Sequence, residues 1–510
     1  MFWAADWVAY HAEHRGDALA LRCAEDGRRT TWAQLEARVA GLAGTLQALG
    51  ARRGDRVALI SENDPRVFEV QFACMRLGAL FVPLNWRLHV NELVDICLDA
   101  QPCVLVHDGQ WAEVATAIAE KAGIPQRISW GGAPGTTDYE SAITTATPLR
   151  PTNDIPMDQP THILYTSGTT GKPKGALSTY STMAWNALNT AHTTGFSQAG
   201  CHHLNPMPLF HAGGLQVMAN PILHFGGAVT TMTRFVPELV LEHLSTSEPP
   251  ITHFTAIALM FKAVADLPDF AHADLSHLRH LVVAGSIATP ELLQQWADRG
   301  HPLQPQYGGT EMGPVATALV DEAAHQDVAK KGSTGRAVLH TQIRLVDSDH
   351  ADVPNGVTGE IWLRGPSITA GYWGRDKADY FTDDGWFRTG DAARRDEDGY
   401  YYPAGRVKEM YKSGGENVYP AEIENVLSLH PDVQDVAVIG ISDEKWGEVG
   451  LAVVVPAPGA DITLDDLNSF AGQRLAKYKL PKKLVLVDDL PRNVTGKLSR
   501  EQLKLDHNGI

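Results

Sequence analysis

The chain has 510 residues, of which 44% are hydrophobic and 20% are charged, and its formal net charge at pH 7 is -17. This length exceeds what one hydrophobic core organises, so several domains are expected, and the composition excludes a disordered protein. The negative charge disfavours nucleic acid and anionic membrane surfaces as partners, so an anionic ligand would need a local group of hydrogen-bond donors.

Cysteine usage and the first residues bear on cellular location. Five cysteines without C-x-x-C spacing indicate reduced, buried thiols rather than a disulfide framework or a zinc site. The first residues, MFWAADWVAYHAEHRG, lack a basic segment followed by an apolar one, and no later run approaches the roughly 20 apolar residues of a membrane span. We therefore expect no membrane span and a cytoplasmic location.

The first 130 residues show helices and apolar strands in alternation. A capping box of Thr31 and Gln34, with leucines at three- and four-residue steps, predicts a helix over 31–50 that ends at glycine. The run RVALI (56–60) predicts a buried strand, and a helix over 66–77 leads to the apolar run ALFVPL (79–84). This alternation predicts an α/β layer with a parallel sheet.

The middle of the chain is predicted to form a surface connection followed by separate strands. Residues 144–161 are rich in proline and threonine without an apolar period, which indicates a surface connection. Apolar runs then predict strands at 162–167, 226–232, 280–285, 342–347 and 360–365.

Past Gly405 the alternation restarts on a smaller scale. The pattern predicts helices at 421–429 and 464–475 and strands at 433–440, 451–456 and 483–489. This predicts a compact second domain of about a hundred residues.

The stretch YTSGTTGKPKG (165–175) is the most distinctive local sequence. It is not a Walker A loop, because its glycines are too close together and Pro173 stands where the magnesium-binding hydroxyl belongs. Its hydroxyls, glycine amides and lysines nevertheless suit an anion, and it follows a predicted strand. The residues thus indicate a phosphate-binding loop of another kind.

Six further motifs follow in order along the chain: PLFHAGG (208–214), YGGTEMG (307–313), GEIWLRGP (359–366), GWFRTGD (385–391), GRVKEMYKSGGENVYPAEIE (405–424) and PRNVTGKL (491–498). Together with the loop they resemble the motifs of the adenylate-forming superfamily, which includes acyl- and aryl-CoA synthetases. The resemblance is nearest to fatty-acyl-CoA ligases and hydroxycinnamate-CoA ligases.

The resemblance implies an α/β fold with a large N-terminal AMP-binding domain of layered α/β subdomains and a small, mobile α+β C-terminal domain. The implied boundaries are 1–404 for the first domain, 405–408 for a hinge centred on Lys408, and 409–510 for the domain that carries the catalytic lysine. The co-substrates and cofactor implied are ATP, coenzyme A and Mg²⁺.

Family roles transfer to residues of two motifs that would surround the ATP phosphates. The loop would close over the β and γ phosphates through Thr166, Ser167, Gly168, Thr169, Thr170, Gly171 and Lys172. In the second motif Thr310 would donate to the α-phosphate, Glu311 would hold Mg²⁺, and Tyr307 would stack on adenine. Gly309 stands where the family usually has a larger apolar residue, which leaves space for a bulky acyl group.

Three more single residues receive roles by resemblance. Asp391 would bind the ribose hydroxyls, with Arg406 reaching the same sugar. Lys497 would enter the site for adenylation and bridge the carboxylate and α-phosphate oxygens.

His211 would gate the acyl pocket, with general acid/base work as an alternative. Amino-acid-activating relatives carry an Asp at this position to pair with the substrate's amine, so His211 argues against an amino acid.

The remaining implied residues concern CoA and the acid. Gly414 and Gly415, after Ser413, would let the pantetheine arm pass, and Trp446 with Gly447 would flank the CoA nucleotide. Gly213, Gly285 and Gly309 would line a roomy acid pocket. A fatty acid and a phenylpropenoic acid fit about equally well, and the oligomeric state, homo-oligomer included, stays open.

The implied reaction has two halves. The acid first displaces pyrophosphate from ATP to give acyl-AMP, and the thiol of CoA then displaces AMP. Two alternatives remain, an adenylation enzyme that loads a carrier-protein thiol and a nucleotide-binding regulatory protein with degraded chemistry. CoA-dependent AMP release would distinguish an acid–CoA ligase from the first alternative. Acid-dependent pyrophosphate release would distinguish it from the second.

Overall fold

The computed structural model describes residues 4–152, 154–166, 173–196, 200–286, 288–320, 327, 330, 332–413, 416–492 and 498–507. By its internal contacts the chain divides into two compact units. The first comprises residues 1–342 and 363–387, and the second comprises residues 343–362 and 388–510.

One sheet of the first unit has seven strands in the order β7-β6-β5-β3-β4-β8-β9. Its strands are parallel except for the last, because β8 and β9 form an antiparallel pair. The bounds are β3 Arg56–Ile60, β4 Leu80–Leu84, β5 Val104–Asp108, β6 Gln126–Trp130, β7 Thr137–Asp138, β8 Pro160–Thr166 and β9 Lys174–Thr179.

The second sheet of this unit has nine strands in the order β16-β15-β14-β13-β12-β10-β11-β1-β2. Its central strands, from β14 to β1, are parallel, as in other α/β folds. The bounds are β1 Leu19–Cys23, β2 Arg29–Thr31, β10 His202–Asn205, β11 Ala228–Thr231, β12 His253–Ala256, β13 His280–Val283, β14 Leu303–Tyr307, β15 Thr317–Ala318 and β16 Arg336–Ala337.

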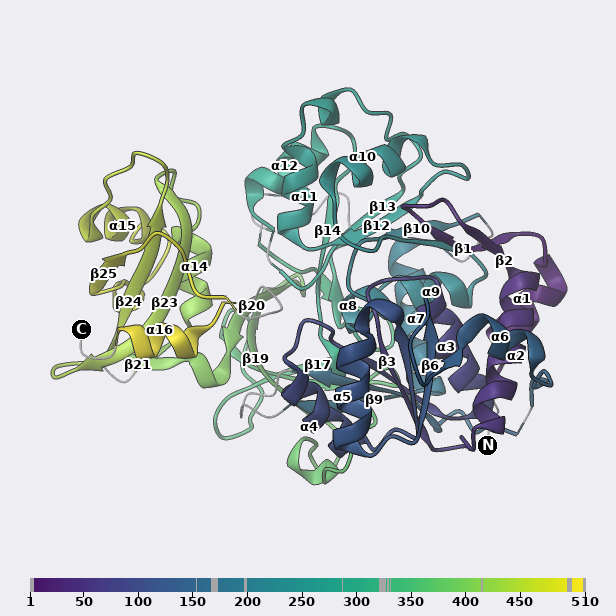
Figure 1. Ribbon diagram of the computed structural model, residues 1–510. Coiled ribbons are helices and arrows are strands. Elements are labelled where there is room, and N and C mark those ends of the chain that lie inside the picture. Colours follow the sequence, from purple (N-terminus) through teal and green to yellow (C-terminus); the bar gives the residue numbers. More distant parts are fainter. Residues whose placement is uncertain are drawn as a thin grey trace. The chain divides into compact units, whose positions relative to one another are not determined.

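Helices cover both sheets in layers (Figure 1). Buried side chains of α4 and α5 pack on one face of the seven-stranded sheet, and those of α10, α11 and α12 pack on one face of the nine-stranded sheet. Between the sheets lie α2, α3, α7 and α9. The bounds are α1 Trp7–Arg15, α2 Trp32–Ala48, α3 Arg66–Leu77, α4 Val90–Ala100, α5 Ala112–Ala122, α6 Tyr139–Thr145, α7 Tyr180–Thr194, α8 Ala212–Leu215, α9 Ala219–His224, α10 Pro237–Thr246, α11 Ala258–Ala265 and α12 Pro290–Ala297.

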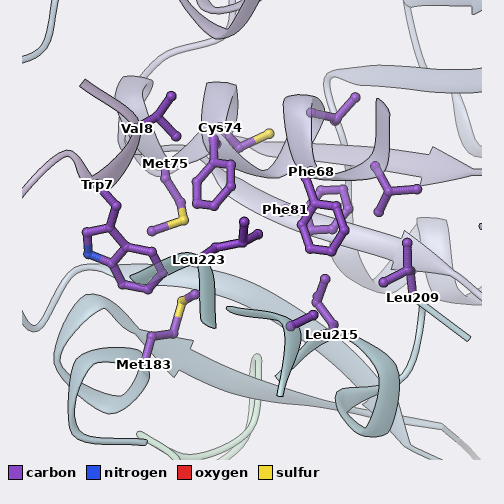
Figure 2. Close-up of a cluster of buried hydrophobic side chains, with 14 of the residues drawn as sticks. Trp7, Val8, Phe68, Cys74, Met75, Phe81, Met183, Leu209, Leu215 and Leu223 are labelled. Atoms are coloured by element: carbon purple, nitrogen blue, oxygen red, sulfur yellow. The ribbon is translucent and has the colours of Figure 1, made fainter. Parts of the chain in front are cut away.

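The largest hydrophobic cluster fills the middle layer of this unit. Figure 2 shows Phe68 and Phe81 from the N-terminal part of the chain facing Leu215 and Leu223. These apolar contacts between segments far apart in sequence are the main source of stability for the unit.

The second unit contains two sheets of its own. One is ordered β17-β18-β19-β20, and the other is ordered β22-β21-β24-β23 with β25 paired to β24. The strands are β17 Gln342–Val346, β18 Gly359–Arg364, β19 Phe387–Arg395, β20 Tyr401–Arg406, β21 Tyr411–Ser413, β22 Glu416–Val418, β23 Val433–Asp443, β24 Gly447–Pro456 and β25 Lys483–Leu486, and the helices are α14 Pro420–Leu427, α15 Leu464–Ala471 and α16 Arg500–Asp506.

Local sequence signals set several of these elements as predicted. The Thr31 side chain accepts from the amide of Gln34, and the Gln34 side chain accepts from the amide of Thr31, which is the predicted capping box of α2. Strand β3 and helix α3 have the predicted bounds, and α3 ends at Gly78 with a φ of 74°.

Other parts of the structure differ from the sequence prediction, among them the layer of the first 130 residues and the end of one helix. The first 130 residues do not form a single layer, because β1 pairs with β11 across some 200 residues of sequence and joins the nine-stranded sheet. The helix predicted over 464–475 ends at Ala471, where Gly472 follows as its cap. The mixed α/β class, with a larger and a smaller part, is confirmed.

The five cysteines, all within the described residues, form no disulfide. Four of them are buried and Cys103 is half-buried. Burial raises the pKa of Cys23 to about 11 and that of Cys97 to about 12. Within the described ranges, no helix is both long and apolar enough to cross a membrane.

Candidate active site

Glu311 lies in a short helical turn, Thr310–Met312, directly after β14. Its Oε1 accepts hydrogen bonds from Thr166 Oγ1 at 3.1 Å and from Tyr372 Oη at 2.9 Å. Its backbone oxygen accepts from the amide of Thr369 at 2.9 Å. The end of β8 and the segment 369–372 thus hold Glu311 at the carboxyl end of a sheet strand, where α/β folds bind ligands.

The turn can form only with glycine at its two ends. A Cβ on Gly308 would lie 1.8 Å from the oxygen of Pro314, and one on Gly313 would lie 2.2 Å from the oxygen of Ser367. Gly313 also has a φ of 87°, a conformation that other residues rarely adopt. The glycines of the motif therefore set the position of Thr310 and Glu311.

A small polar cavity of about 10 Å³ lies beneath this turn, which is about the space of one water molecule. Around it, Gln216 Nε2 donates to Ser178 Oγ at 3.0 Å, and Asn186 Nδ2 donates to the oxygen of Gln216 at 2.7 Å. Its lining residues are Leu177, Ser178, Thr182, Met183, Asn186, Gln216, Asn220, Thr310, Gly313, Ser367 and Thr369.

Thr166 ends β8 and pairs with Lys174 at the start of β9. The predicted phosphate-binding loop therefore joins two antiparallel strands next to Glu311. The ammonium of Lys174 lies 4.9 Å from the ring centre of Tyr380, a cation–π contact. The loop residues Ser167, Gly168, Thr169, Thr170, Gly171 and Lys172 lie outside the described residues.

His211 immediately precedes the short helix α8, and its backbone oxygen accepts from the amides of Gly214 and Leu215. A Cβ on Gly214 would lie 2.3 Å from the oxygen of Pro208, so this bend requires glycine. A Cβ on Gly213 would meet Met207 Cε at 3.3 Å.

Two buried asparagines hold the His211 segment from below. Asn63 Nδ2 donates to the oxygens of Met207 and Met232, each at 2.9 Å, and its Oδ1 accepts from the amide of Leu209 at 2.8 Å. Asn205 Nδ2 donates to the oxygen of Gly214 at 2.9 Å. The backbone on both sides of His211 is thus held by hydrogen bonds from these two asparagine side chains.

Gly285 follows β13 and is exposed, with a φ of 74°. The only atom within 4 Å of a Cβ placed there is Ile257 Cγ2, at 3.9 Å, among the described residues. Gly309 is half-buried, and a Cβ there would make only ordinary contacts with Met312 and Glu311. Both glycines leave space at the ends of neighbouring strands.

In the second unit, Asp391 and Arg406 lie opposite each other on β19 and β20. Arg406 Nε is 2.7 Å from Asp391 Oδ1, and Arg406 Nη1 donates to the oxygen of Thr389 at 3.2 Å. Thr389 Oγ1 in turn accepts from the amide of Asp391 at 3.0 Å. The guanidinium fixes one carboxylate oxygen of Asp391.

The residues predicted for CoA also come together in this unit. Ser413 of β21 pairs with Gly447 of β24. Trp446 is 43% exposed, and its amide donates to Asp443 Oδ1 at 2.9 Å. Gly414 and Gly415 lie outside the described residues.

Lys408, the predicted hinge residue, lies in a single helical turn, Val407–Glu409. The next residue, Glu409, forms an ion pair with Arg500 of α16 at 3.0 Å. Lys497, the predicted adenylation lysine, lies outside the described residues.

Sequence reasoning missed three groups that hold the site: the Tyr372 hydroxyl, the Thr369 amide and the Asn63 side chain. None lies in a motif with an assigned role, and only their contacts in the fold identify them. A tyrosine in an irregular segment carries no sequence signal of its own.

The residues fit a magnesium ion shared with phosphate. Mg²⁺ binds one or two carboxylates together with phosphate oxygens and water, so a single fixed carboxylate such as Glu311 suits it. In the described part of the chain no group of three or more His, Cys, Asp or Glu side chains could hold a metal by itself. The site thus suits an ion that arrives with a nucleotide.

Comparisons with known proteins bear on the whole chain. The family described as AMP-binding enzyme matches residues 8–373, and the AMP-binding enzyme C-terminal domain matches residues 422–497. The chain is similar to a feruloyl-CoA synthase of an Amycolatopsis species, with 39% identity over 500 residues and 98% of each chain covered. It is also similar to an indoleacetate–CoA ligase of Aromatoleum aromaticum, with 37% identity; the match covers 98% of this chain and 97% of that ligase.

The fold is similar to that of ATP-bound MatB from Rhodopseudomonas palustris, with a TM-score of 0.88 and 29% identity. That similarity covers 99% of both chains.

Proposed function

The chain belongs to the AMP-binding enzyme family, and on this premise we propose how its residues act and which acid it takes. It is an ATP-dependent acid–CoA ligase, which activates a carboxylic acid as acyl-AMP with release of pyrophosphate and transfers the acyl group to CoA. The observation that carries the residue assignments is the Glu311 carboxylate, held by Thr166 and Tyr372 where the phosphate-binding loop begins.

In the first half-reaction the acid carboxylate attacks the α-phosphorus of ATP, the bond to the β-phosphate oxygen breaks, and pyrophosphate leaves. Thr310 donates to an α-phosphate oxygen, Lys497 bridges that phosphate and the carboxylate, and the loop around Thr169 and Lys172 holds the departing phosphates. Glu311 would hold Mg²⁺, which supplies charge neutralisation at the phosphates.

The nucleotide's sugar is bound by Asp391. Because Arg406 Nε lies 2.7 Å from Asp391 Oδ1, the carboxylate is held in one orientation, in which it accepts from the ribose hydroxyls. Tyr307, at the end of β14, stacks on the adenine.

In the second half-reaction the thiolate of CoA attacks the acyl carbon and AMP leaves. Rotation at Lys408 withdraws Lys497 and brings the segment after Ser413 to the site. The pairing of Ser413 with Gly447 supports one route for CoA that passes both, with the half-exposed Trp446 beside its nucleotide.

The acid is an aromatic one. The relatives at 39% and 37% identity are named for ferulate and indoleacetate, which are both aromatic acids. His211, in place of an amine-binding carboxylate, disfavours an amino acid. Because the reaction consumes ATP and CoA, we place the protein in the cytoplasm.

The test is acid-dependent exchange of labelled pyrophosphate into ATP, followed by CoA-dependent release of AMP. Purified protein with ATP and Mg²⁺ is offered aromatic acids and fatty acids of C4 to C16. We expect exchange with aromatic acids and AMP release once CoA is added. If no acid of the panel promotes exchange, the assignment is wrong. If exchange occurs but CoA does not cause release of AMP, the acceptor is another thiol.

A further inference from the structure

The nine-stranded sheet has two faces of opposite character. On one face, Leu204, Phe254, Leu281, Val283 and Leu303 pack against α10, α11 and α12 in an apolar core. Most of the alternate residues of the same strands are polar, whereas Val282 on β13 is apolar and belongs to the middle-layer cluster. The polar ones are His203 and Asn205 on β10, His253 and Thr255 on β12, His280 on β13, and Gln304 and Gln306 on β14. A parallel sheet covered on both faces usually has apolar strands throughout, so this face is exceptional.

Helix α7 covers the polar face. Its Ala191 packs in the same cluster as Val282 of β13, and the backbone oxygen of its Thr194 is 3.4 Å from His253 Nε2. This helix also presents buried polar side chains to the middle layer, those of Asn186, Asn189, Thr190 and Thr193. A polar layer therefore lies between α7 and strands β12 and β13, and Gln304 and Gln306 lie on the neighbouring strand β14.

Several hydrogen-bonding groups of this layer have no partner among the described residues. They are both amide atoms of Gln306, Oγ1 of Thr255 and Nδ2 of Asn189, whereas the Gln304 side chain has a hydrogen bond with His280. The side chains of Gln306, Thr255 and Asn189 are 7%, 1% and 1% exposed. Because an unsatisfied buried polar group destabilises the fold, several of them in one layer indicate a missing partner.

The layer begins directly below the candidate acid site. Val283 pairs with Pro305, so Gln306 lies beside Ala284, one residue before the exposed Gly285. Thr255 and Gln304 both pair with Val282, about 10 Å deeper along the strands than Gly285. Gln306 is also the residue immediately before Tyr307, at the start of the turn that carries Glu311.

The layer is polar but uncharged. Burial lowers the pKa of His203 and of His253 to about 3, so both imidazoles are neutral at pH 7. A second carboxylate on the acid would find no compensating charge here, whereas a neutral hydroxyl or ring N–H would find amide and hydroxyl partners.

We propose that the acid carries a hydrogen-bonding group on its ring, a phenolic hydroxyl or a ring N–H, and that Gln306 and Thr255 bind this group and select for it. This inference rests on the proposed function and extends it from aromatic acids in general to those with a polar ring substituent. Unsubstituted aromatic acids and unbranched fatty acids would leave these side chains unpaired and so be poorer substrates.

The test compares acids that differ by one hydrogen-bonding group. The first pair is 4-hydroxycinnamate and cinnamate, the second is indole-3-acetate and naphthalene-1-acetate, and octanoate represents the fatty acids. We expect kcat/KM for CoA-dependent AMP formation to be about tenfold or more higher for the polar member of at least one pair. The pair with the larger ratio tells whether the group is a hydroxyl or a ring N–H.

The variant Gln306→Leu has a similar side-chain volume without the amide. We expect it to reduce that preference by about tenfold, and to raise the unfolding temperature of the ligand-free enzyme by about 1–3 °C because it removes an unsatisfied buried group. A merely structural role for the amide would instead lower the unfolding temperature and leave the preference unchanged. Gln126→Leu, on a strand of the other sheet, is the matched control and should keep the wild-type preference.

The outcomes separate the inference from the function on which it rests. AMP formation with equal kcat/KM for both members of each pair would overturn the ring-substituent inference and leave the ligase assignment standing. Absence of AMP formation with every acid of the panel would overturn both. A preference that survives in Gln306→Leu and in Thr255→Val would show that other residues bind the ring.

Discussion

Glu311 is the residue whose geometry most directly predicts a kinetic effect. In Glu311→Gln the amide oxygen can still accept from Thr166 and Tyr372, but the charge that would hold Mg²⁺ is lost. We expect pyrophosphate exchange to fall by about 10²-fold or more, with a higher Mg²⁺ requirement. Tyr372→Phe, which keeps the charge and removes one hydrogen bond, should cost much less, and equal losses in the two variants would contradict the metal role.

Lys497 offers a separation of the two half-reactions. Lys497→Ala should lower acyl-AMP formation by about 10²-fold or more, because it removes a positioned charge at the α-phosphate. Thioester formation from supplied acyl-AMP and CoA should continue, since in the proposed mechanism that step proceeds with the lysine withdrawn. Single-turnover measurements of each half-reaction test this, and normal rates in both would remove Lys497 from the mechanism.

At the scale of residues, the sequence identifies the side chains predicted to bind the nucleotide. It identifies less well the residues that position those side chains. Thr310, Glu311, Asp391 and Lys497 stand in motifs whose residue types suit phosphate, metal and ribose. Their contacts with the ligand stay predictions. Tyr372 could not be anticipated, because its contact with Glu311 joins segments 61 residues apart.

At the scale of elements, the turn from Gly308 to Gly313 is the most constrained segment. Gly313→Ala would place a methyl group 2.2 Å from the oxygen of Ser367 and strain a φ of 87°. The turn must move, and a displacement of about 1 Å at Glu311 is enough to reduce adenylation by about 10²-fold. Pyrophosphate exchange measures this.

A stability control distinguishes a displaced turn from general destabilisation. Thr31→Ala removes the cap of α2 and should cost about 1 kcal/mol of unfolding free energy without changing kcat. If Thr31→Ala lowers kcat as much as Gly313→Ala does, the effect on the turn is not specific.

Secondary structure was predictable where one local pattern determines it. Helix α2 has both a capping box and an apolar stripe, and β3 is a short apolar run, so both have clear local signals. The pairing of β1 with β11 and the order of the nine-stranded sheet depend on contacts distant in sequence. The polar face of that sheet was missed because β10, β12 and β14 are short and rich in polar residues, so no apolar run predicted these strands.

For the whole molecule, the proposed mechanism requires movement at the predicted hinge between the two half-reactions. Lys408→Pro restricts φ in the turn Val407–Glu409. We expect it to slow thioester formation more than acyl-AMP formation, because only the second step needs the rotation. Single-turnover assays that show both steps equally affected would argue against a hinge at this residue.

Stability should depend on pH through buried imidazoles. Burial lowers the pKa to about 3 for His162, His203 and His253 and to about 4 for His202 and His224. Below about pH 6.5 the imidazoles of the unfolded chain bind protons, whereas the buried imidazoles of the folded chain stay neutral. Their contribution to the free energy of unfolding is therefore complete above pH 6.5 and is lost as pH falls toward about 4. Each imidazole contributes at most roughly 1.4 kcal/mol per pH unit in that window.

Urea unfolding between pH 7.5 and 4.5 measures this dependence. His162→Gln, which keeps a polar group near Thr161 and Gln71, should flatten the slope by one imidazole's share. A midpoint that does not change between pH 7 and pH 5 would mean that these imidazoles take up protons in the folded state.

The burial of the thiols has a practical consequence for assays. CoA is itself a thiol, and a chromogenic disulfide reagent reacts with thiolates. Because burial holds the pKa of Cys23 at about 11 and that of Cys97 at about 12, these side chains carry almost no thiolate at pH 8. The colour formed during turnover therefore reports remaining CoA with little contribution from these two thiols of the native enzyme, and a slow later rise in their reaction reports molecules that have unfolded.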